Sequence, residues 1–115
     1  MVRPTIVLPR ANRLTKKKDF EVIFKKGKGV KDDFLIFKIL KNHLKKSRFG
    51  FIVSKKVSNK ATVRNKIKRR LRDAVFKKLD EIKNNIDVII VALPGIENKE
   101  FSEIQEAIDK FLKYV

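Results

Sequence analysis

The chain of 115 residues contains no cysteine, no tryptophan and a single histidine, His43. Without thiols it can form neither disulfides nor thiolate metal sites, and one imidazole cannot build a histidine cluster. A glycine-rich phosphate loop of the form GxxxxGK[ST] is also missing. These absences exclude several metal-dependent and nucleotide-dependent activities. The lack of cysteine is compatible with a reducing cytoplasm, which is the expected location.

Long apolar runs are missing as well. The longest, over residues 88–93, is far shorter than the roughly 18 residues that a membrane span needs. Arg3 and Arg10 are not followed by a continuous apolar segment, so the sequence predicts no secretory signal. We therefore expect no membrane partner.

Acidic residues are scarce through most of the chain. Residues 1–78 carry 26 Lys or Arg against five acids, whereas residues 79–115 carry four against eight, and the total charge is +17. A compact domain with this charge repels itself unless a polyanion neutralises it, so nucleic acid is the first candidate partner. A nuclease that uses protein-bound metal ions gathers several carboxylates. The basic part has few acids, and Asp32 and Asp33 would point to opposite faces of a strand.

Length and periodicity predict one domain over residues 13–115, which its positive charge makes an expected RNA-binding domain, preceded by an extended N-terminal arm over residues 1–12 that contains Pro4 and Pro9. The order of helices and strands indicates an α+β fold in which helices pack on a mainly antiparallel sheet. The first expected element is a helix capped by Thr15 and stopped by Gly27, followed by a loop or edge strand over 27–33. Strands over 34–40 and 48–54 are expected to form a hairpin, and a helix capped by Ser58 or Asn59 is expected to end near Ile82. A buried strand over 86–93 and a last helix with Ser102 and Gln105 at capping-box spacing complete the domain.

The central helix carries the strongest functional pattern. Arg64, Lys68 and Arg72 recur every four residues beside an apolar stripe, and Asn65 and Arg69 lie alongside. A solvated helix face normally mixes charges of both signs. Here no acid occurs between residues 33 and 73, so the cations repel one another unless phosphates lie against them. The expected inward residues are Val63, Ile67, Leu71, Ala74, Val75 and Leu79.

The first helix places Phe20, Ile23 and Phe24 on one apolar face beside a lysine-rich turn. Two interpretations remain open for the two phenylalanine rings. They can belong to the core, or they can line a surface and stack on the bases of single-stranded nucleic acid.

Residues 51–74, FIVSKKVSNKATVRNKIKRRLRDA, resemble the signature of the bacterial ribonuclease P protein subunit. In that family a strand ending in Ser-Lys-Lys leads into a helix with the pattern Ala-x-x-Arg-Asn-Arg-x-Lys-Arg-x-x-Arg. The segment RLTKKKDFEVIFKKGK is similar to the family's first helix, and the resemblance spans about residues 13–113. Lys66 departs from the pattern, because lysine keeps the charge of the third motif residue but lacks the bidentate guanidinium.

The resemblance implies the protein component of a ribonucleoprotein endoribonuclease that removes the 5′ leader of precursor tRNA. It implies that the RNA subunit carries out the hydrolysis and binds most of the Mg²⁺, and it points to no catalytic residue, metal ligand or protein partner for this chain. It also implies a two-layer sandwich similar to one ribosomal-protein domain, with a left-handed βαβ crossover through the central helix.

Site residues follow from the same resemblance, position by position. The residues expected to bind the RNA subunit are Lys55, Lys56, Arg64, Asn65, Lys66, Lys68, Arg69 and Arg72. The residues expected to bind the leader are Lys16, Phe20, Phe24, Phe34 and Phe37.

Two alternatives use the same basic helix. A ribosomal or ribosome-assembly protein would bind RNA without any substrate turnover. A DNA-binding protein would insert the helix into a major groove, but the sequence shows no helix-turn-helix partner and no dimerisation seam.

Overall fold

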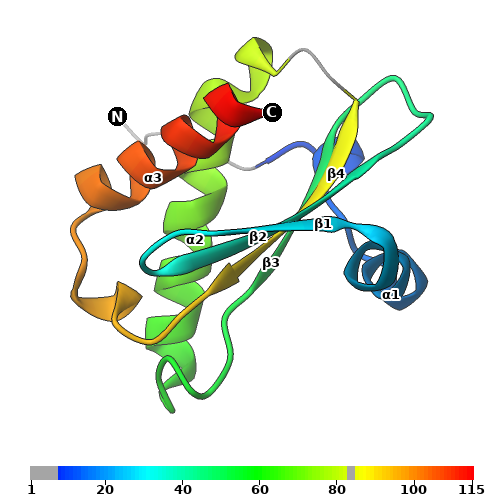
Figure 1. The fold of residues 1–115 in the computed structure, drawn as a ribbon. Coiled ribbons are helices and arrows are strands. Elements are labelled where there is room, and N and C mark those ends of the chain that lie inside the picture. The colour runs from blue at the N-terminus through cyan, green and yellow to red at the C-terminus, as the bar shows by residue number, and fades with distance from the viewer. Residues whose placement is uncertain (1–7, 83–84) are drawn as a thin grey trace.

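The structure is a computed structural model that describes residues 8–82 and 85–115 (Figure 1). Its centre is a four-stranded sheet with the strand order β1-β2-β4-β3. The strands are β1 (Lys28–Lys31), β2 (Leu35–Lys41), β3 (Arg48–Ile52) and β4 (Ile86–Ala92). The α-helices are α1 (Lys17–Lys26), α2 (Ala61–Lys78) and α3 (Phe101–Tyr114), and short 3₁₀ helices cover Arg10–Asn12, Leu79–Glu81 and Ile96–Asn98. The predicted α+β class with helices on a mainly antiparallel sheet is confirmed.

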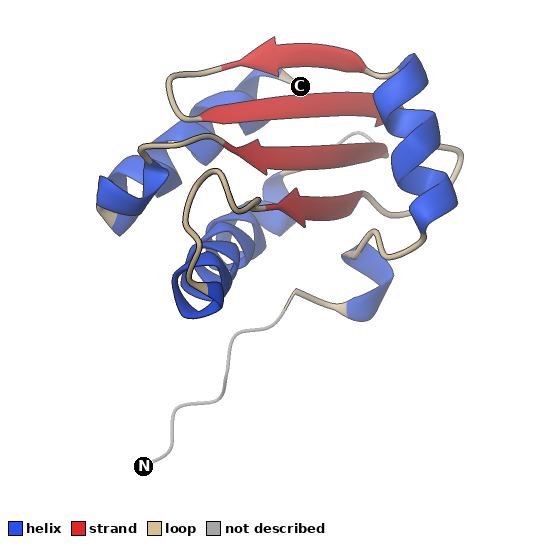
Figure 2. Ribbon diagram, turned by 90° about the horizontal axis from the view of Figure 1, so that it is seen from below, coloured by secondary structure: helices blue, strands red, loops and turns tan. Residues whose placement is uncertain are grey.

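The helices are divided between the two faces of the sheet. α2 and α3 cover one face together, whereas α1 lies across one end of the other face (Figures 1 and 2). The larger hydrophobic cluster joins alternate residues of the strands to the inner sides of α2 and α3. A smaller cluster, built around Leu14, Ile23 and Ile89, lies under α1. None of the helices in residues 8–82 and 85–115 covers the rest of the second face, which we call the open face.

β4 occupies an interior position of the sheet because its residues need burial on both faces. Ile86, Val88, Ile90 and Ala92 belong to the cluster under α2 and α3, and Ile89 is fully buried on the opposite face. The prediction of a strand covered on both faces is confirmed for residues 86–90, whereas Val91 on the second face is only partly buried.

The predicted hairpin between the two strands before α2 is wrong. β4 lies between β2 and β3, pairing antiparallel with β2 and parallel with β3. The physical reason is that the most apolar strand gains most from two neighbours, and it comes last of the four in sequence. The connection over residues 42–47 therefore crosses above the end of another strand, and α2 is the crossover between the parallel pair.

Helix ends differ from the predicted caps in the first two helices. α1 begins after Lys16 without a side-chain cap, so Thr15 is not the cap. Gly27 does end α1, as its C-cap residue. A Cβ at this position would lie 2.5 Å from the carbonyl oxygen of Ile23, so only glycine fits there. α2 begins after Lys60, whose N–H donates to the hydroxyl of Ser58 at 3.2 Å. α2 ends at residue 78, and a 3₁₀ turn replaces the last helical turn that periodicity predicted.

The capping box of α3 also lies elsewhere than predicted. The N–H of Glu100 donates to the Glu103 carboxylate at 2.9 Å, so this pair starts the helix in place of Ser102 and Gln105. Gln105 instead donates to the carbonyl oxygen of Ala74 at 3.0 Å. That bond ties α3 to α2 within the covered layer.

The predicted extended arm falls mostly on residues 1–7, which lie outside the described residues. The remaining part is packed on the domain. Leu8 is fully buried in the larger cluster, and the amide of Asn12 donates to the carbonyl oxygen of Ser47 at 2.8 Å. Residues 8–12 are therefore part of the folded unit.

Candidate nucleic-acid interface

α2 turns its apolar stripe toward the sheet, as predicted. Ile67, Leu71, Ala74 and Val75 are buried, and Val63 and Leu79 are partly buried against the same cluster. This packing fixes the rotation of the helix about its own axis. The polar residues of the motif must then lie on its flanks and on its outer side.

Arg64, Lys68 and Arg72 form a half-buried ladder along one flank of α2. Arg64 donates through Nη1 to the carbonyl oxygen of Ser58 at 2.9 Å, and the Arg72 guanidinium carbon lies 6.0 Å from the ring centroid of Phe51. Each of these contacts holds the stem of a cation in place while leaving part of it accessible. The other three motif residues, Asn65, Lys66 and Arg69, are exposed.

The motif cations of α2, between residues 64 and 72, form no ion pairs with the described acids. In the part of the chain that the structure describes, the ion pairs are Arg48–Asp19, Arg48–Asp87 and Lys78–Glu81. None of the six motif residues from 64 to 72 takes part in them. Their charges repel one another on a rigid helix, which favours a polyanion against this face.

Lys55 and Lys56 lie in an exposed turn between β3 and α2. The N–H of Lys56 donates to the Ser54 hydroxyl at 3.3 Å, and Val57, with 7% exposure, anchors the turn in the core. The bond between Arg64 and Ser58 closes the segment against α2. The fold thus brings the basic pair to the start of the basic helix, as the sequence motif requires.

The open face presents a row of residues that strand register aligns. Lys31, Ile36, Val91 and Ile52 are successive partners across β1, β2, β4 and β3. The three apolar members are only partly buried, because α1 does not cover this row. The neighbouring row, which includes Ile89 and Gly50, lies under α1.

α1 contributes two aromatic rings beside this row. Ile23, with 1% exposure, points into the sheet, and helical spacing places Phe20 and Phe24 on one of its flanks. Asp19 lies on the opposite flank, toward Arg48 at the start of β3. The aromatic flank therefore faces the uncovered row, and Phe24 is 43% exposed. Phe20 is half-buried, so it belongs in part to the packed interior, whereas Phe24 lies on the surface.

We name the open-face surface by five residues: Phe20, Phe24, Ile36, Ile52 and Val91. Sequence reasoning found the two phenylalanines but missed the three aliphatic residues. The available signal was that both faces of the strand over 34–40 are apolar although only one face could be covered by long helices. Lys16, also predicted, is exposed at the start of α1.

Phe34 and Phe37 do not join this surface, and the structure corrects their predicted placement. Phe37 is 1% exposed and stacks on Phe111 with a centroid distance of 3.8 Å, on the face covered by α3. Phe34 is 9% exposed in the same cluster, and the ammonium group of Lys99 lies 5.5 Å from its ring centroid. A ring packed in this way cannot stack on a base, so neither Phe34 nor Phe37 is part of the proposed leader-binding surface.

The carboxylates do not gather into a metal centre. Across residues 8–82 and 85–115, no three His, Asp or Glu side chains are grouped so that they could hold a metal ion. Asp32 and Asp33 lie in the turn between β1 and β2, where the N–H of Asp33 donates to the Asp32 carboxylate at 2.7 Å. The hydrogen bond between Asp33 and Asp32 therefore stabilises the turn.

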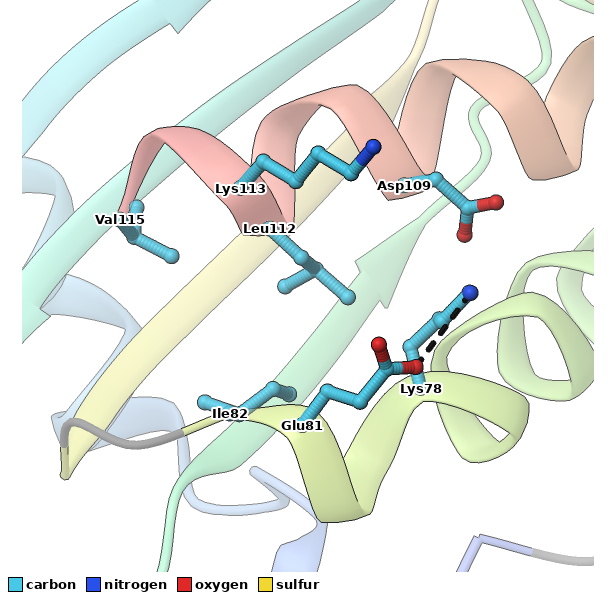
Figure 3. Close-up of a pocket in the computed structure, with 7 residues that line it drawn as sticks. All are labelled: Lys78, Glu81, Ile82, Asp109, Leu112, Lys113 and Val115. Carbon is cyan, nitrogen blue, oxygen red and sulfur yellow. Dashed lines mark ion pairs between the residues drawn. The ribbon is translucent and has the colours of Figure 1, made fainter.

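A cavity of about 450 Å³ lies on the covered side, between the ends of α2 and α3 (Figure 3). Its lining residues are Lys78, Glu81, Ile82, Asp109, Leu112, Lys113 and Val115. Lys78 pairs with Glu81 at 3.3 Å, and Asp109 accepts a hydrogen bond from Gln105 at 2.8 Å. The acids are therefore engaged within the protein, and the cavity shares no residue with α2's basic motif or the open-face surface.

Among the described helices, none combines the length and the apolar composition required to cross a bilayer.

A basic crossover helix and an uncovered sheet face next to the exposed Phe24 define an RNA-binding α+β protein. The family model described as Ribonuclease P matches residues 8–115. The ribonuclease P protein component of Alkaliphilus metalliredigens is 34% identical over 97 residues, which cover 84% of this chain and 86% of the relative. The corresponding protein of Alkaliphilus oremlandii is 37% identical over 102 residues, covering 89% of each chain.

Solved structures agree with these sequence relatives. The ribonuclease P protein of Staphylococcus aureus superposes with a TM-score of 0.81 at 31% identity, covering 91% of this chain and 95% of that one. The protein of Thermotoga maritima superposes with a TM-score of 0.82 at 29% identity, covering 90% and 96%. The chain belongs to the ribonuclease P protein family, the protein subunits of a tRNA-processing ribonuclease.

Proposed function

We propose that the chain binds the catalytic RNA of ribonuclease P through α2 and the preceding turn, and holds the 5′ leader of precursor tRNA on the open face. The observation that carries the proposal is the arrangement of two chemically distinct surfaces on one rigid sheet. One is the basic motif of α2, whose cations form no ion pairs with the described acids, and the other is an uncovered apolar row on the sheet face that carries α1 and the exposed Phe24. The first suits folded RNA, and the second suits an unpaired strand.

The α2 surface would bind by charge and shape. The major groove of A-form RNA is too narrow for side chains to read base edges, so phosphates and backbone are the accessible groups. The ladder of Arg64, Lys68 and Arg72 spans two helical turns, or about 12 Å at 1.5 Å per residue, which lets it meet several successive phosphates. Asn65 adds a directional donor and acceptor. Lys66 would contribute a point charge without a bidentate fork.

The open-face surface would bind the leader by stacking and apolar contact. Every base has a π-face, so a ring such as Phe24 binds any leader sequence, with about 1–3 kcal/mol per stacked base. Ile36, Val91 and Ile52 form a floor beside the ring, and Lys31 lies at the β1 end of the row. Lys16, at the start of α1, would attract the leader phosphates.

In this proposal the protein raises the affinity for substrate and the RNA cleaves the phosphodiester bond. Mg²⁺ would be held mainly by the RNA, because the described acids supply no grouped ligands for it. The cysteine-free composition is consistent with work in the cytoplasm.

A cleavage assay tests the proposal. Precursor tRNA is incubated with the catalytic RNA at low magnesium concentration, with and without this chain, and the 5′ products are measured. We expect the chain to stimulate cleavage at the mature 5′ end. The matched control is the chain with Arg64, Lys68 and Arg72 replaced by alanine, which should stimulate far less. No stimulation by the intact chain would contradict the proposal and favour a ribosomal or ribosome-assembly role.

A further inference from the structure

Arg48, the first residue of β3, links three segments at one end of the open face. Its guanidinium donates to both carboxylate oxygens of Asp87 on β4, through Nε at 2.9 Å and Nη2 at 2.6 Å. Its third nitrogen, Nη1, donates to Asp19 of α1 at 3.3 Å. Only the planar fork of arginine can serve two carboxylates in this way, since a lysine offers one ammonium group.

The β4 half of this network is rigid. The side chain of Asp87 is 7% exposed, and one of its oxygens also accepts a hydrogen bond from the amide of Asn42 at 2.7 Å. Arg48 and Asp87 are direct register partners on neighbouring strands. The hydrogen bond to Asp87 raises the pKa of Arg48, and burial opposes that shift only in part. The guanidinium is therefore a fixed, permanently charged anchor for Asp19.

The α1 half of the network adjoins the aromatic contact. Phe20 follows Asp19, and Gly50 lies two residues after Arg48. The ring of Phe20 lies directly over Gly50, close enough that a Cβ at position 50 would be 2.5 Å from Cζ. α1 and β3 thus touch at two places, the ion pair of Asp19 with Arg48 and the contact of the Phe20 ring with the backbone of Gly50. Two separated contacts resist rotation of a helix about its axis, which a single contact does not.

The position of these contacts matters for Phe24. Along β4, residues 87, 89 and 91 belong to three successive rows of the open face. Asp19 meets the first row through Arg48, and Ile23 and Phe20 pack with the second row at Ile89 and Gly50. Helical spacing directs Phe24, on the flank of α1 away from Asp19, toward the third row. Release of Asp19 would free α1 to roll over Ile23. Such a roll changes how far Phe24 stands from the aliphatic floor.

We propose that Asp19 and Arg48 are positioning residues for leader binding, which hold α1 at the rotation that sets Phe24 beside the floor of Ile36, Ile52 and Val91. This inference rests on the proposed function of the open face. It assigns a role in substrate recognition to two charged residues that would act through the orientation of α1.

The test compares Asp19→Asn with Glu21→Gln in the complex of RNA subunit and protein. Each substitution removes one negative charge from α1, but Glu21 is exposed and makes no ion pair within the described residues. Removal of a negative charge should, by simple electrostatics, strengthen RNA binding in both variants. The measured quantity is the ratio of affinities for leader-bearing precursor and leaderless tRNA.

We expect Asp19→Asn to lower this ratio roughly fivefold. Glu21→Gln should leave the ratio unchanged, and Asp19→Glu, which restores the carboxylate, should recover part of it. Affinity for the RNA subunit alone should not fall in any of the three. Circular dichroism checks that each variant remains folded at the assay temperature, because a general loss of structure would reduce both affinities together.

Failure of this inference is distinguishable from failure of the proposed function. If Asp19→Asn and Glu21→Gln give the same ratio while Phe24→Ala lowers it, the open face binds the leader and the positioning role is refuted. If the unaltered complex shows no preference for the leader, the proposed leader surface is refuted and the inference falls with it.

Discussion

The ring of Phe20 fills the space above Gly50 that any side chain at position 50 would need. A Cβ built there would lie 2.5 Å from Cζ and 2.7 Å from Cε1 of the ring, and 3.2 Å from Cβ of Leu14. Gly50 is needed here for this close approach, and positive φ plays no part. The sheet thereby admits α1 closely enough for Ile23 to reach Ile89, and this approach sets the border of the open face.

Gly50→Ala should therefore destabilise the domain and weaken leader binding. The added methyl must push the Phe20 ring and α1 outward, and overpacking of this kind costs about 1–3 kcal/mol. Urea unfolding followed by circular dichroism measures the loss. Gly29→Ala is the matched control, because its Cβ would meet only the flexible side chain of Lys38, at 3.4 Å or more. Equal stability of the two variants would contradict the close packing of Phe20.

Replacing Arg64, Lys68 and Arg72 with alanine should weaken binding to the RNA subunit and flatten its salt dependence. Each phosphate contact contributes about 0.7–0.9 unit to the slope of log K against log salt, so the loss of three contacts should lower the magnitude of the slope by about 2–3 units. Filter binding at several salt concentrations measures both effects.

The control for this triple variant replaces Lys45, Lys110 and Lys113, which are exposed on other parts of the chain. It removes the same charge without touching α2. If the two triple variants change the slope equally, binding depends on net charge alone, and the assignment of the ladder as the RNA-subunit surface is wrong.

Phe24→Ala should reduce affinity for leader-bearing precursor by about 1–3 kcal/mol while leaving leaderless tRNA almost unaffected. Its ring is 43% exposed, so the fold loses little when it is removed. Phe76→Ala provides the comparison, since Phe76 is also on a helix and 38% exposed but lies on α2, away from the open face. A similar loss of leader preference in both variants would argue against a specific role for Phe24.

Asp87→Asn should lower the free energy of unfolding by about 2 kcal/mol, because the Arg48 guanidinium would lose its charged partner. Partial exposure of Arg48, at 23%, lets water compensate for some of the loss. Asp80→Asn, at an exposed position in the 3₁₀ turn after α2, should change stability by less than about 0.5 kcal/mol. Thermal unfolding compares the two, and an equally small change at Asp87 would show that the network contributes no net stability.

The periodicity of residues 61–75 was sufficient to predict both faces of α2. Its inward residues are those with apolar spacing, and its cations lie outside, because local helical geometry fixes which residues share a face. Phe34 and Phe37 show the opposite situation. An aromatic residue in a strand is equally consistent with either face, and only the position of Phe111 on α3 shows that the ring of Phe37 is enclosed.

The basic helix and its family motif, the absence of disulfides, the buried character of residues 86–92 and the α+β class follow from the sequence alone, because each depends on composition or on local repeat. The tertiary structure alone decided that β4 separates β2 from β3, that α1 lies on the opposite face from α2 and α3, and that Ile36, Val91 and Ile52 align in one partly buried row on the face that carries α1. These relations join segments that are far apart in the sequence, such as α1 and α3. They depend on which strands pair and which sheet face each helix packs against. These long-range choices are not determined by any local sequence pattern.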